Sequence, residues 1–300
     1  MKAAIDIGTN TVRLLVADLV GDGLVDVERR TEIVGLGRGV DATGRFDPGR
    51  VEHALAVLTD YAARLRFHGV SQVRAVATSA TRDAEDASDF LDRVAGVLGF
   101  RPELIDGIEE AALSFRGATA ALLGLHPTLV IDPGGGSTEF VLGAAAPDYS
   151  VSLDIGSVRL TERLLPERPA SPDRVTAAAA EVAEIFGLVR LPTSPARVIG
   201  VAGTFTSLAA ISLGLDPYDR EAVHGSALTM ADLDRLVDRL SGLTVEETAA
   251  IPSLEPKRAP VLLGGAIVAR EAVRVSGLDS VTVSEADLLD GMVLALVDSE

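Results

Sequence analysis

Short aliphatic stretches alternate with longer stretches of helical periodicity along the first part of the chain. The stretches with the length and residue types of strands are residues 3–8, 11–18, 23–37, 72–79 and 102–106. The stretches with apolar positions at helical spacing are residues 47–69, 83–99 and 108–124. The predicted order is three strands joined as a meander, followed by helix, strand, helix, strand and helix.

The same order returns, with additions, in the second part of the chain. Its predicted strands are residues 128–136, 137–143, 149–156, 197–203 and 280–284. Its predicted helices are residues 157–165, 174–187, 204–214 and 258–277, with a helical stretch after residue 229 and a final helix. "DIGTNT" (6–11) and "DPGGGS" (132–137) both fit the pattern D-x-G-x-x-[ST]. We therefore predict a duplicated fold with a cleft between its halves.

Composition supports two α/β domains and narrows the class of function. The 300 residues are 47% hydrophobic and 4% aromatic, and they include no cysteine, which excludes disulfides and thiolate chemistry. The first residues do not resemble a signal peptide, and no later stretch is apolar enough to span a membrane. The formal net charge of -17 argues against broad binding to nucleic acid or to an anionic membrane. We expect a cytoplasmic protein with a small-molecule ligand.

The two repeated loops have the parts of a phosphate site. In each, a strand delivers an aspartate, a glycine-rich turn follows, and a hydroxyl residue begins the return strand. Glycines let a ligand approach the backbone, whose N–H groups can converge on phosphate oxygens. Asp6 and Asp132 would repel phosphate unless a cation intervenes, which argues for Mg²⁺ or a similar hard ion. A tight β-turn without a ligand is the alternative for either loop taken alone.

Other glycine-rich segments are weaker signals. Residues 198–210 place Gly203, Thr204 and Thr206 at a predicted helix N-terminus, where an anion is favoured and where a simple threonine cap is the alternative. "DIGSVRL" (154–160) is interpreted as a secondary wall and "GLGRGV" (35–40) as a loop. No Walker-type phosphate loop, H-E-x-x-H or G-x-S-x-G motif occurs. The four histidines are scattered along the chain without metal-ligand spacing, and His224 is the one histidine kept as a candidate for a functional role.

Six segments in order resemble the exopolyphosphatase and guanosine pentaphosphate phosphohydrolase (Ppx/GppA) family. They are "AAIDIGTNTVRLLVAD", "ATSATRDAED", "GIEEA", "DPGGGSTE", "SLDIGSVRLTER" and "AGTFTSLAA". The resemblance implies the fold of the actin, Hsp70 and sugar-kinase superfamily. That fold is two actin-like (ribonuclease H-like) βββαβαβα domains, here residues 1–120 and 121–300, flanking an interdomain cleft. The C-terminal helix, about residues 286–300, would be able to pack back on the first domain.

The resemblance also implies roles for individual residues. Glu110, the second glutamate of "GIEEA", would orient or deprotonate water, and Asp132 and Glu139 complete the expected catalytic set. Asp6, Asp132 and Glu139 are the expected ligands of Mg²⁺ or Mn²⁺. The expected phosphate-binding residues are Gly8, Thr9, Asn10, Thr11, Arg13, Arg82, Gly134, Gly135, Gly136, Ser137, Gly203 and Thr204.

Some of these assignments have structural alternatives. Glu109 and Glu110 lie at a predicted helix start, where carboxylates favour the helix dipole without any chemistry. Arg82 also lies near a helix start, a poor place for a cation unless an anion is present. Pro133 replaces an expected Ile or Val and removes one N–H donor. The chain resembles the short, two-domain form of the family.

The function expected from this resemblance is hydrolysis of terminal phosphoryl groups of inorganic polyphosphate, with short chains preferred because of the acidic surface. Hydrolysis of guanosine pentaphosphate (pppGpp) is the main alternative. A superfamily kinase and a non-catalytic sensor of phosphate-rich ligands stay open as further alternatives. A homodimer is compatible with this interpretation, although the sequence does not reveal the oligomeric state.

Overall fold

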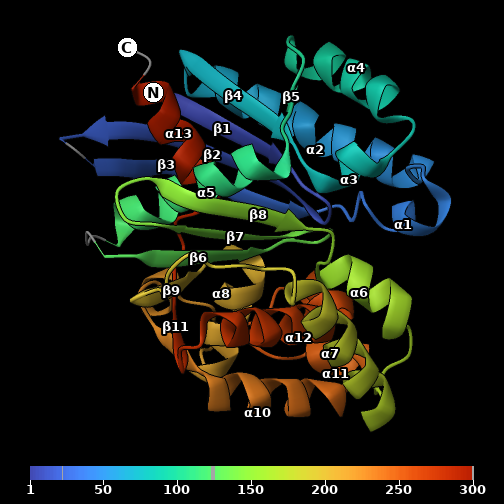
Figure 1. Ribbon diagram of the computed structural model, residues 1–300. Helices are drawn as coiled ribbons and strands as arrows, with labels where there is room; N and C mark the ends of the chain where they lie inside the picture. Colours follow the sequence, from blue (N-terminus) through green and yellow to red (C-terminus); the bar gives the residue numbers. More distant parts are fainter. Residues whose placement is uncertain (22, 123–125, 299–300) are drawn as a thin grey trace. The chain divides into compact units, whose positions relative to one another are not determined.

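The computed structural model describes residues 1–21, 23–122 and 126–298, which divide into two compact units (Figure 1). The first unit is Met1–Gly117 together with the segment from Leu288 onward, and the second is Ala118–Asp287. The strands are β1 (Lys2–Ile7), β2 (Thr11–Val20), β3 (Gly23–Ile33), β4 (Gln72–Ala77), β5 (Glu103–Leu104), β6 (Thr128–Pro133), β7 (Thr138–Gly143), β8 (Pro147–Leu153), β9 (Arg197–Gly200), β10 (Ala227–Thr229) and β11 (Ser280–Val283).

Helices follow the strands in both units. They are α1 (Val40–Thr43), α2 (Pro48–Phe67), α3 (Ser79–Asp83), α4 (Ala87–Leu98), α5 (Gly107–Ala121), α6 (Ser157–Leu164), α7 (Pro172–Phe186), α8 (Ala202–Ser212), α9 (Arg220–Val223), α10 (Met230–Ser241), α11 (Val245–Ala249), α12 (Ala259–Ser276) and α13 (Leu288–Val297), with a 3₁₀ turn η1 (Pro256–Arg258). Proline in the first turn with a preceding acceptor starts two of them, because the side chains of Asp47 and Ser171 accept backbone N–H groups of α2 and α7.

The two sheets have matching topology. The first has the strand order β3-β2-β1-β4-β5, with β1 antiparallel to β2 and parallel to β4. The second has the order β10-β11-β9-β6-β7-β8, with β6 antiparallel to β7 and parallel to β9. In both, a three-strand meander is extended on its first strand by two parallel strands, and the second sheet adds β10, which is antiparallel to β11. This confirms the predicted duplication, while the cleft between the domains stays a prediction.

Both faces of the first sheet are covered by helices. Alternation along β1 puts Ala3, Ile5 and Ile7 in one cluster with residues of α2 and α4. Ala4, between them, belongs to a separate cluster with residues of α5 and α13. The C-terminal helix therefore forms part of the core of the first unit. It is also tied to the sheet by Arg29 of β3, whose guanidinium donates to both carboxylate oxygens of Asp290.

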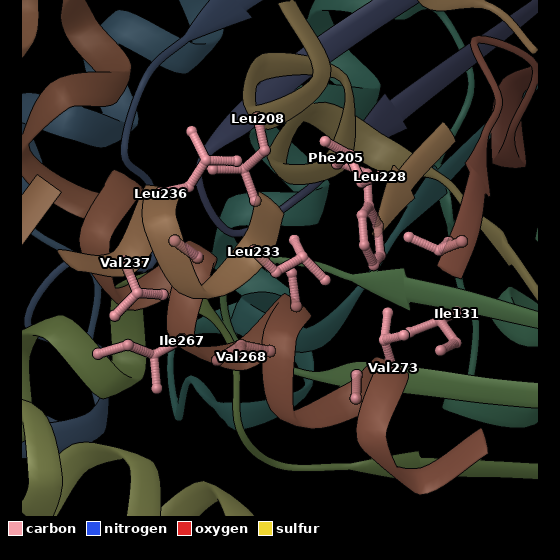
Figure 2. Packing of buried hydrophobic residues seen from close by; sticks show 14 of the residues in the cluster. Ile131, Phe205, Leu208, Leu228, Leu233, Leu236, Val237, Ile267, Val268 and Val273 are labelled. Atoms are coloured by element: carbon pink, nitrogen blue, oxygen red, sulfur yellow. The ribbon is translucent and has the colours of Figure 1, made fainter. Parts of the chain in front are cut away.

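The core of the second unit surrounds α12. Figure 2 shows side chains of this core from β6, α8, β10, α10 and α12, and α12 is buried over most of its length. Gly264 and Gly265 face α6 and α8 at such short range that a Cβ on Gly264 would lie 2.8 Å from the carbonyl oxygen of Ser157. These small residues let α12 pack closely against α6 and α8.

The predicted elements are largely confirmed, and the differences are local. The strand predicted over 72–79 ends at Ala77, because Thr78 makes the last bond to β1 through the carbonyl of Ile7 and then accepts the first helical bonds of α3. β3 ends at Ile33 rather than at residue 37. The short strand β10 was not predicted. Residues 123, 124, 299 and 300 of the predicted helices lie outside the described residues.

Candidate functional site

The β1–β2 turn carries the first predicted loop. Asp6 of β1 is buried and lies opposite Arg13 of β2, whose Nε donates to the Asp6 carboxylate at 2.8 Å. The backbone N–H of Gly8 donates to the carbonyl of Thr11 at 2.9 Å and closes the turn. A Cβ on Gly8 would lie 3.3 Å from that carbonyl oxygen, so glycine suits this close approach. The structure thus places two side chains of the predicted site, the acidic Asp6 and the basic Arg13, in direct contact.

The end of β4 adds polar side chains to this loop. Oγ1 of Thr9 accepts the backbone N–H of Ala80 at 3.2 Å, which ties the loop to α3. Within the described residues, Oδ1 of Asn10 and the hydroxyl oxygens of Ser79 and Thr81 are buried without a hydrogen-bond partner. Buried polar atoms of this kind call for water or a ligand. Asn10 belongs to the predicted set, whereas the other two were not predicted.

Glu110 lies in the first turn of α5, and its carboxylate is held in place by an arginine from α3. Arg82 of α3 donates to its carboxylate at 3.0 Å and to the carbonyl of Ile105 at 2.9 Å. Asp106 caps the helix, with its side chain accepting the N–H groups of Ile108 and Glu109. The cap fixes where α5 begins, and the ion pair fixes the direction of the Glu110 side chain. Arg82 therefore contacts the predicted catalytic carboxylate.

Neighbouring strands bring two carboxylates together in the second unit. Asp132 of β6 and Glu139 of β7 are cross-strand partners, so both side chains lie on the same face of the sheet. Both residues are buried. The hydroxyl of Ser152, the β8 partner of Glu139, donates to Oε1 of Glu139 at 2.7 Å. This arrangement holds the glutamate in place beside the glycine loop.

Residues 134–137 form the turn between these strands. The backbone N–H of Gly134 donates to the carbonyl of Ser137 at 2.9 Å and closes the turn. Along the described chain, no acceptor takes the backbone N–H groups of Gly135 and Gly136. Two unclaimed N–H groups at a glycine turn are what a phosphate cradle requires. Pro133 is the last residue of β6, so its missing N–H lies in the strand and leaves these donors intact.

A third turn leads from β9 into α8. Ala202 has a φ of 64°, in the left-handed region that alanine rarely adopts. The Thr204 hydroxyl donates to the carbonyl of Pro133 at 3.4 Å, which links this turn to the glycine loop. The guanidinium of Arg258 lies against Gly203, where a Cβ would overlap it. The structure therefore places a cation beside Gly203, one of the predicted phosphate-binding residues.

Further along, Tyr218 and His224 lie in a network around Glu285. The hydroxyl of Tyr218 donates to Glu285, and burial together with this carboxylate raises the pKa of Tyr218. Nδ1 of His224 accepts the backbone N–H of Glu285 at 3.1 Å. Arg220 donates to the same carboxylate at 3.1 Å. This network gives His224 a structural partner.

The residues of the second loop fit a hard divalent cation. Two carboxylates on one sheet face, next to the glycine turn, match the way Mg²⁺ is held by few protein oxygens together with phosphates and water. In the ranges that the structure covers, no three His, Cys, Asp or Glu side chains gather into a cluster that could hold a metal ion by themselves. Asp132 and Glu139 could therefore supply carboxylate oxygens to such an ion, which would need further ligands from elsewhere.

Comparison with known proteins assigns the chain to a family. The model of the Ppx/GppA phosphatase family matches residues 15–300. The chain belongs to the Ppx/GppA phosphatase family. Exopolyphosphatase 2 of Mycobacterium tuberculosis is 46% identical to it over 312 residues, covering 98% of both chains. Membership confirms the resemblance and the predicted fold class.

Solved structures of Ppx/GppA proteins agree with this assignment. A family member from Aquifex aeolicus superposes with a TM-score of 0.85 at 31% identity, covering 99% of this chain and 97% of that one. An exopolyphosphatase from Cytophaga hutchinsonii superposes with a TM-score of 0.90 at 28% identity, covering 99% and 98%. No helix among the described residues is long and apolar enough to cross a membrane.

Besides Ser79 and Thr81, motif reasoning on this Ppx/GppA chain missed three sets of contacts at the site. Arg258 was not predicted as a site residue. It lies at the start of the long helix α12, where the helix dipole disfavours a cation, and the same argument marks Arg82 as a candidate. The "GLGRGV" segment contacts the first loop, because Gly37 donates its N–H to the carbonyl of Thr9. The "DIGSVRL" segment contacts the second loop in the same manner, through Arg159 and its neighbours. The glycines of both segments were the available signal.

Proposed function

We propose that the protein is an exopolyphosphatase that hydrolyses the terminal phosphoryl group of inorganic polyphosphate. Its similarity to proteins named exopolyphosphatase supports this substrate. The observation that carries the proposal is the pair of unclaimed N–H groups at Gly135 and Gly136, directly after the strand that bears Asp132. A ligand with anionic oxygens supplies the acceptors that these groups lack.

Catalysis in this proposal depends on positioning and on neutralising charge. Phosphoryl transfer to water requires an oriented nucleophile and stabilised equatorial oxygens more than covalent help. Glu110 accepts a proton from the attacking water, or orients it, through one carboxylate oxygen. Arg82 keeps that carboxylate in one direction through the 3.0 Å hydrogen bond to its other oxygen, Oε2. Arg82 is therefore a positioning residue in addition to its predicted role toward phosphate.

Asp132 and Glu139 would hold Mg²⁺, or Mn²⁺, beside the glycine loop. When bound, the ion would neutralise charge on the phosphate oxygens. Ser152 keeps Glu139 in place for this role, and the N–H groups of the loop bind phosphate oxygens directly. Asp6 stays a predicted ligand, and its carboxylate accepts a hydrogen bond from Arg13.

Short polyphosphates are the preferred substrates in this proposal. The net charge of -17 repels a long polyanion that runs past the site along the protein surface. Hydrolysis rates against a series of defined chain lengths should therefore level off at short chains. Efficiency that keeps rising to hundreds of phosphate units would contradict this preference. The homodimer and the cytoplasmic location remain predictions.

The test is orthophosphate release from polyphosphate, pppGpp and ATP, each with Mg²⁺, by the unchanged protein and by E110Q. The unchanged protein should release phosphate from polyphosphate most efficiently. E110Q should lose about 10² to 10⁴ in kcat while its affinity for tripolyphosphate is retained, since the lost function is acid-base catalysis or water positioning. Greater efficiency with pppGpp would assign the alternative substrate. Phosphate transfer only from ATP to a sugar would indicate a kinase, and binding without turnover a sensor.

A further inference from the structure

The glycine loop of the second unit is held through its carbonyl groups. The carbonyl oxygens of Gly134 and Gly135 accept hydrogen bonds of 3.0 and 2.9 Å from backbone N–H groups in the first turn of α6. The carbonyl oxygen of Gly136 accepts a hydrogen bond of 2.9 Å from the Nε–H group of Arg159, which also lies in α6. Residues 157–159 thus donate hydrogen bonds to three consecutive carbonyls of the loop.

The first loop is held in the same manner by a different segment. The carbonyl oxygen of Thr9 accepts the N–H of Gly37 at 2.7 Å. The carbonyl oxygen of Asn10 accepts the first two N–H groups after β3, at 3.0 and 2.9 Å. Residues 34–37 therefore bind two consecutive carbonyls of this loop. Motif analysis assigns no catalytic or phosphate-binding residue to either of these two segments.

A hydrogen bond that fixes the direction of a carbonyl group also fixes the direction of the N–H group of the next residue. A trans peptide group is planar, and its C=O and the N–H of the following residue point in opposite directions. Because the carbonyls of Gly134 and Gly135 point toward α6, the N–H groups of Gly135 and Gly136 point away from it. By the same rule, the N–H groups of Asn10 and Thr11 point away from residues 34–37. The direction of each phosphate donor is therefore set from behind.

We propose that residues 34–37 and residues 156–159 are positioning segments, each of which fixes the N–H groups of one glycine loop for binding phosphate. The inference rests on the proposed function, since it needs the loops to bind phosphate. It adds Gly37 and Arg159 to the residues on which substrate affinity depends, although neither residue binds phosphate in this proposal.

Glycine is required where these segments approach the loops. A Cβ on Gly156 would lie 2.6 Å from the carbonyl carbon and oxygen of Gly135. A Cβ on Gly37 would overlap the Cγ2 methyl of Thr9 and lie 2.9 Å from the Cβ of Ala80. Alanine at either glycine must therefore displace a loop or its neighbour. The clash at Gly37 is mainly with one methyl group, which offers a rescue experiment.

The first experiment uses G37A, the double variant T9S/G37A and T9S alone as its baseline. G37A should raise KM for tripolyphosphate about 10-fold or more, because small misplacements of binding groups are costly. Removing the Thr9 methyl keeps the hydroxyl and relieves the larger of the two overlaps, while the 2.9 Å contact with Ala80 stays, so T9S/G37A should recover part of the affinity relative to T9S. G96A is the matched control, since a Cβ there meets nothing within 4 Å. An unchanged KM in G37A, or no rescue in the double variant, would overturn the inference.

The second experiment changes the side chain of Arg159, which hydrogen-bonds the loop, with little risk to folding. Arg159 is half-buried, and R159M keeps its aliphatic stem while losing the hydrogen bond to Gly136. We expect the Kd for tripolyphosphate with Mg²⁺, measured calorimetrically in the E110Q background, to rise at least about 3-fold with an unchanged thermal midpoint. R163M, on the same helix, is the control and should bind as tightly as its parent. Equal affinities of R159M and R163M would contradict the proposal even if G37A fails to fold.

The two failures can be told apart. If the unchanged protein neither binds nor hydrolyses polyphosphate, the proposed function fails, and the positioning inference fails with it. If the unchanged protein binds and hydrolyses polyphosphate while both sets of variants match their controls, only the positioning inference fails.

Discussion

Replacing Gly203 with alanine should separate stability from substrate affinity. The new Cβ overlaps the guanidinium of Arg258, which lies at the end of a long, flexible side chain and can move aside. In a helix interior alanine is favoured over glycine by roughly 0.5–1 kcal/mol, and at the second residue of α8 part of this preference offsets the cost of that movement. The net change in the free energy of unfolding should therefore stay within about 1 kcal/mol.

The effect on substrate should be larger. If Arg258 donates a charge-assisted hydrogen bond to phosphate, its displacement costs about 1.5–3 kcal/mol. That energy corresponds to a loss of roughly 10- to 150-fold in kcat/KM, since each 1.36 kcal/mol is tenfold. The assay is orthophosphate release from tripolyphosphate, beside urea unfolding of the same samples.

Two controls make this prediction sharp. G96A, a change from glycine to alanine inside α4, should leave kcat/KM unchanged because its Cβ meets nothing within 4 Å. R258A should lose about as much as G203A, and the double variant should lose little more, because both changes remove the same contact. The reasoning is refuted if G203A keeps its full kcat/KM while R258A loses activity.

Three further predictions concern stability and are checked by urea unfolding. Hydrogen bonds from Arg30 and His68 lower the pKa of Glu28 from 4.5 to about 2, so E28Q should cost about 1–2 kcal/mol at pH 6 after allowance for solvent screening. The ionised Glu28 carboxylate stabilises the fold fully above its unfolded pKa and progressively less as pH falls toward 2. The difference in the free energy of unfolding between E28Q and the unchanged protein should therefore shrink by pH 3, and a difference that stays constant with pH would contradict this prediction. G291A should destabilise by about 1–3 kcal/mol, because its Cβ overlaps the carbonyl oxygen of Leu113 in α5; wild-type stability would count against this contact. A202G should stabilise by about 0.5–1 kcal/mol by relieving the left-handed alanine, and any loss of stability would contradict that.

Local signals explain why much of the fold could be predicted. In the β1–β2 and β6–β7 hairpins, the aspartate, the glycines and the hydroxyl residue are neighbours in sequence, so their proximity needs no tertiary information. The duplicated pattern then gives the matching order of strands. The pairing of Asp132 with Glu139 follows from the turn between them, because a tight turn fixes the register.

Contacts between distant segments could not be read in the same way. Arg258 reaches Gly203 from 55 residues further along the chain (258 − 203 = 55), and neither position has a periodic pattern that links them. Arg82 pairs with Glu110 because β4, α3 and α5 converge, which is a property of packing. The short strand β10 was missed because three residues carry too little alternation to be recognised.

The central claim is that the glycine loops hold phosphate through backbone N–H groups. The most direct measurement is the ¹⁵N–¹H spectrum of protein labelled at glycine, in the E110Q background, titrated with tripolyphosphate and Mg²⁺. The resonances of Gly135 and Gly136 should shift most among the glycines, and Gly96 should not move. Binding that leaves Gly135 and Gly136 unchanged would contradict the account.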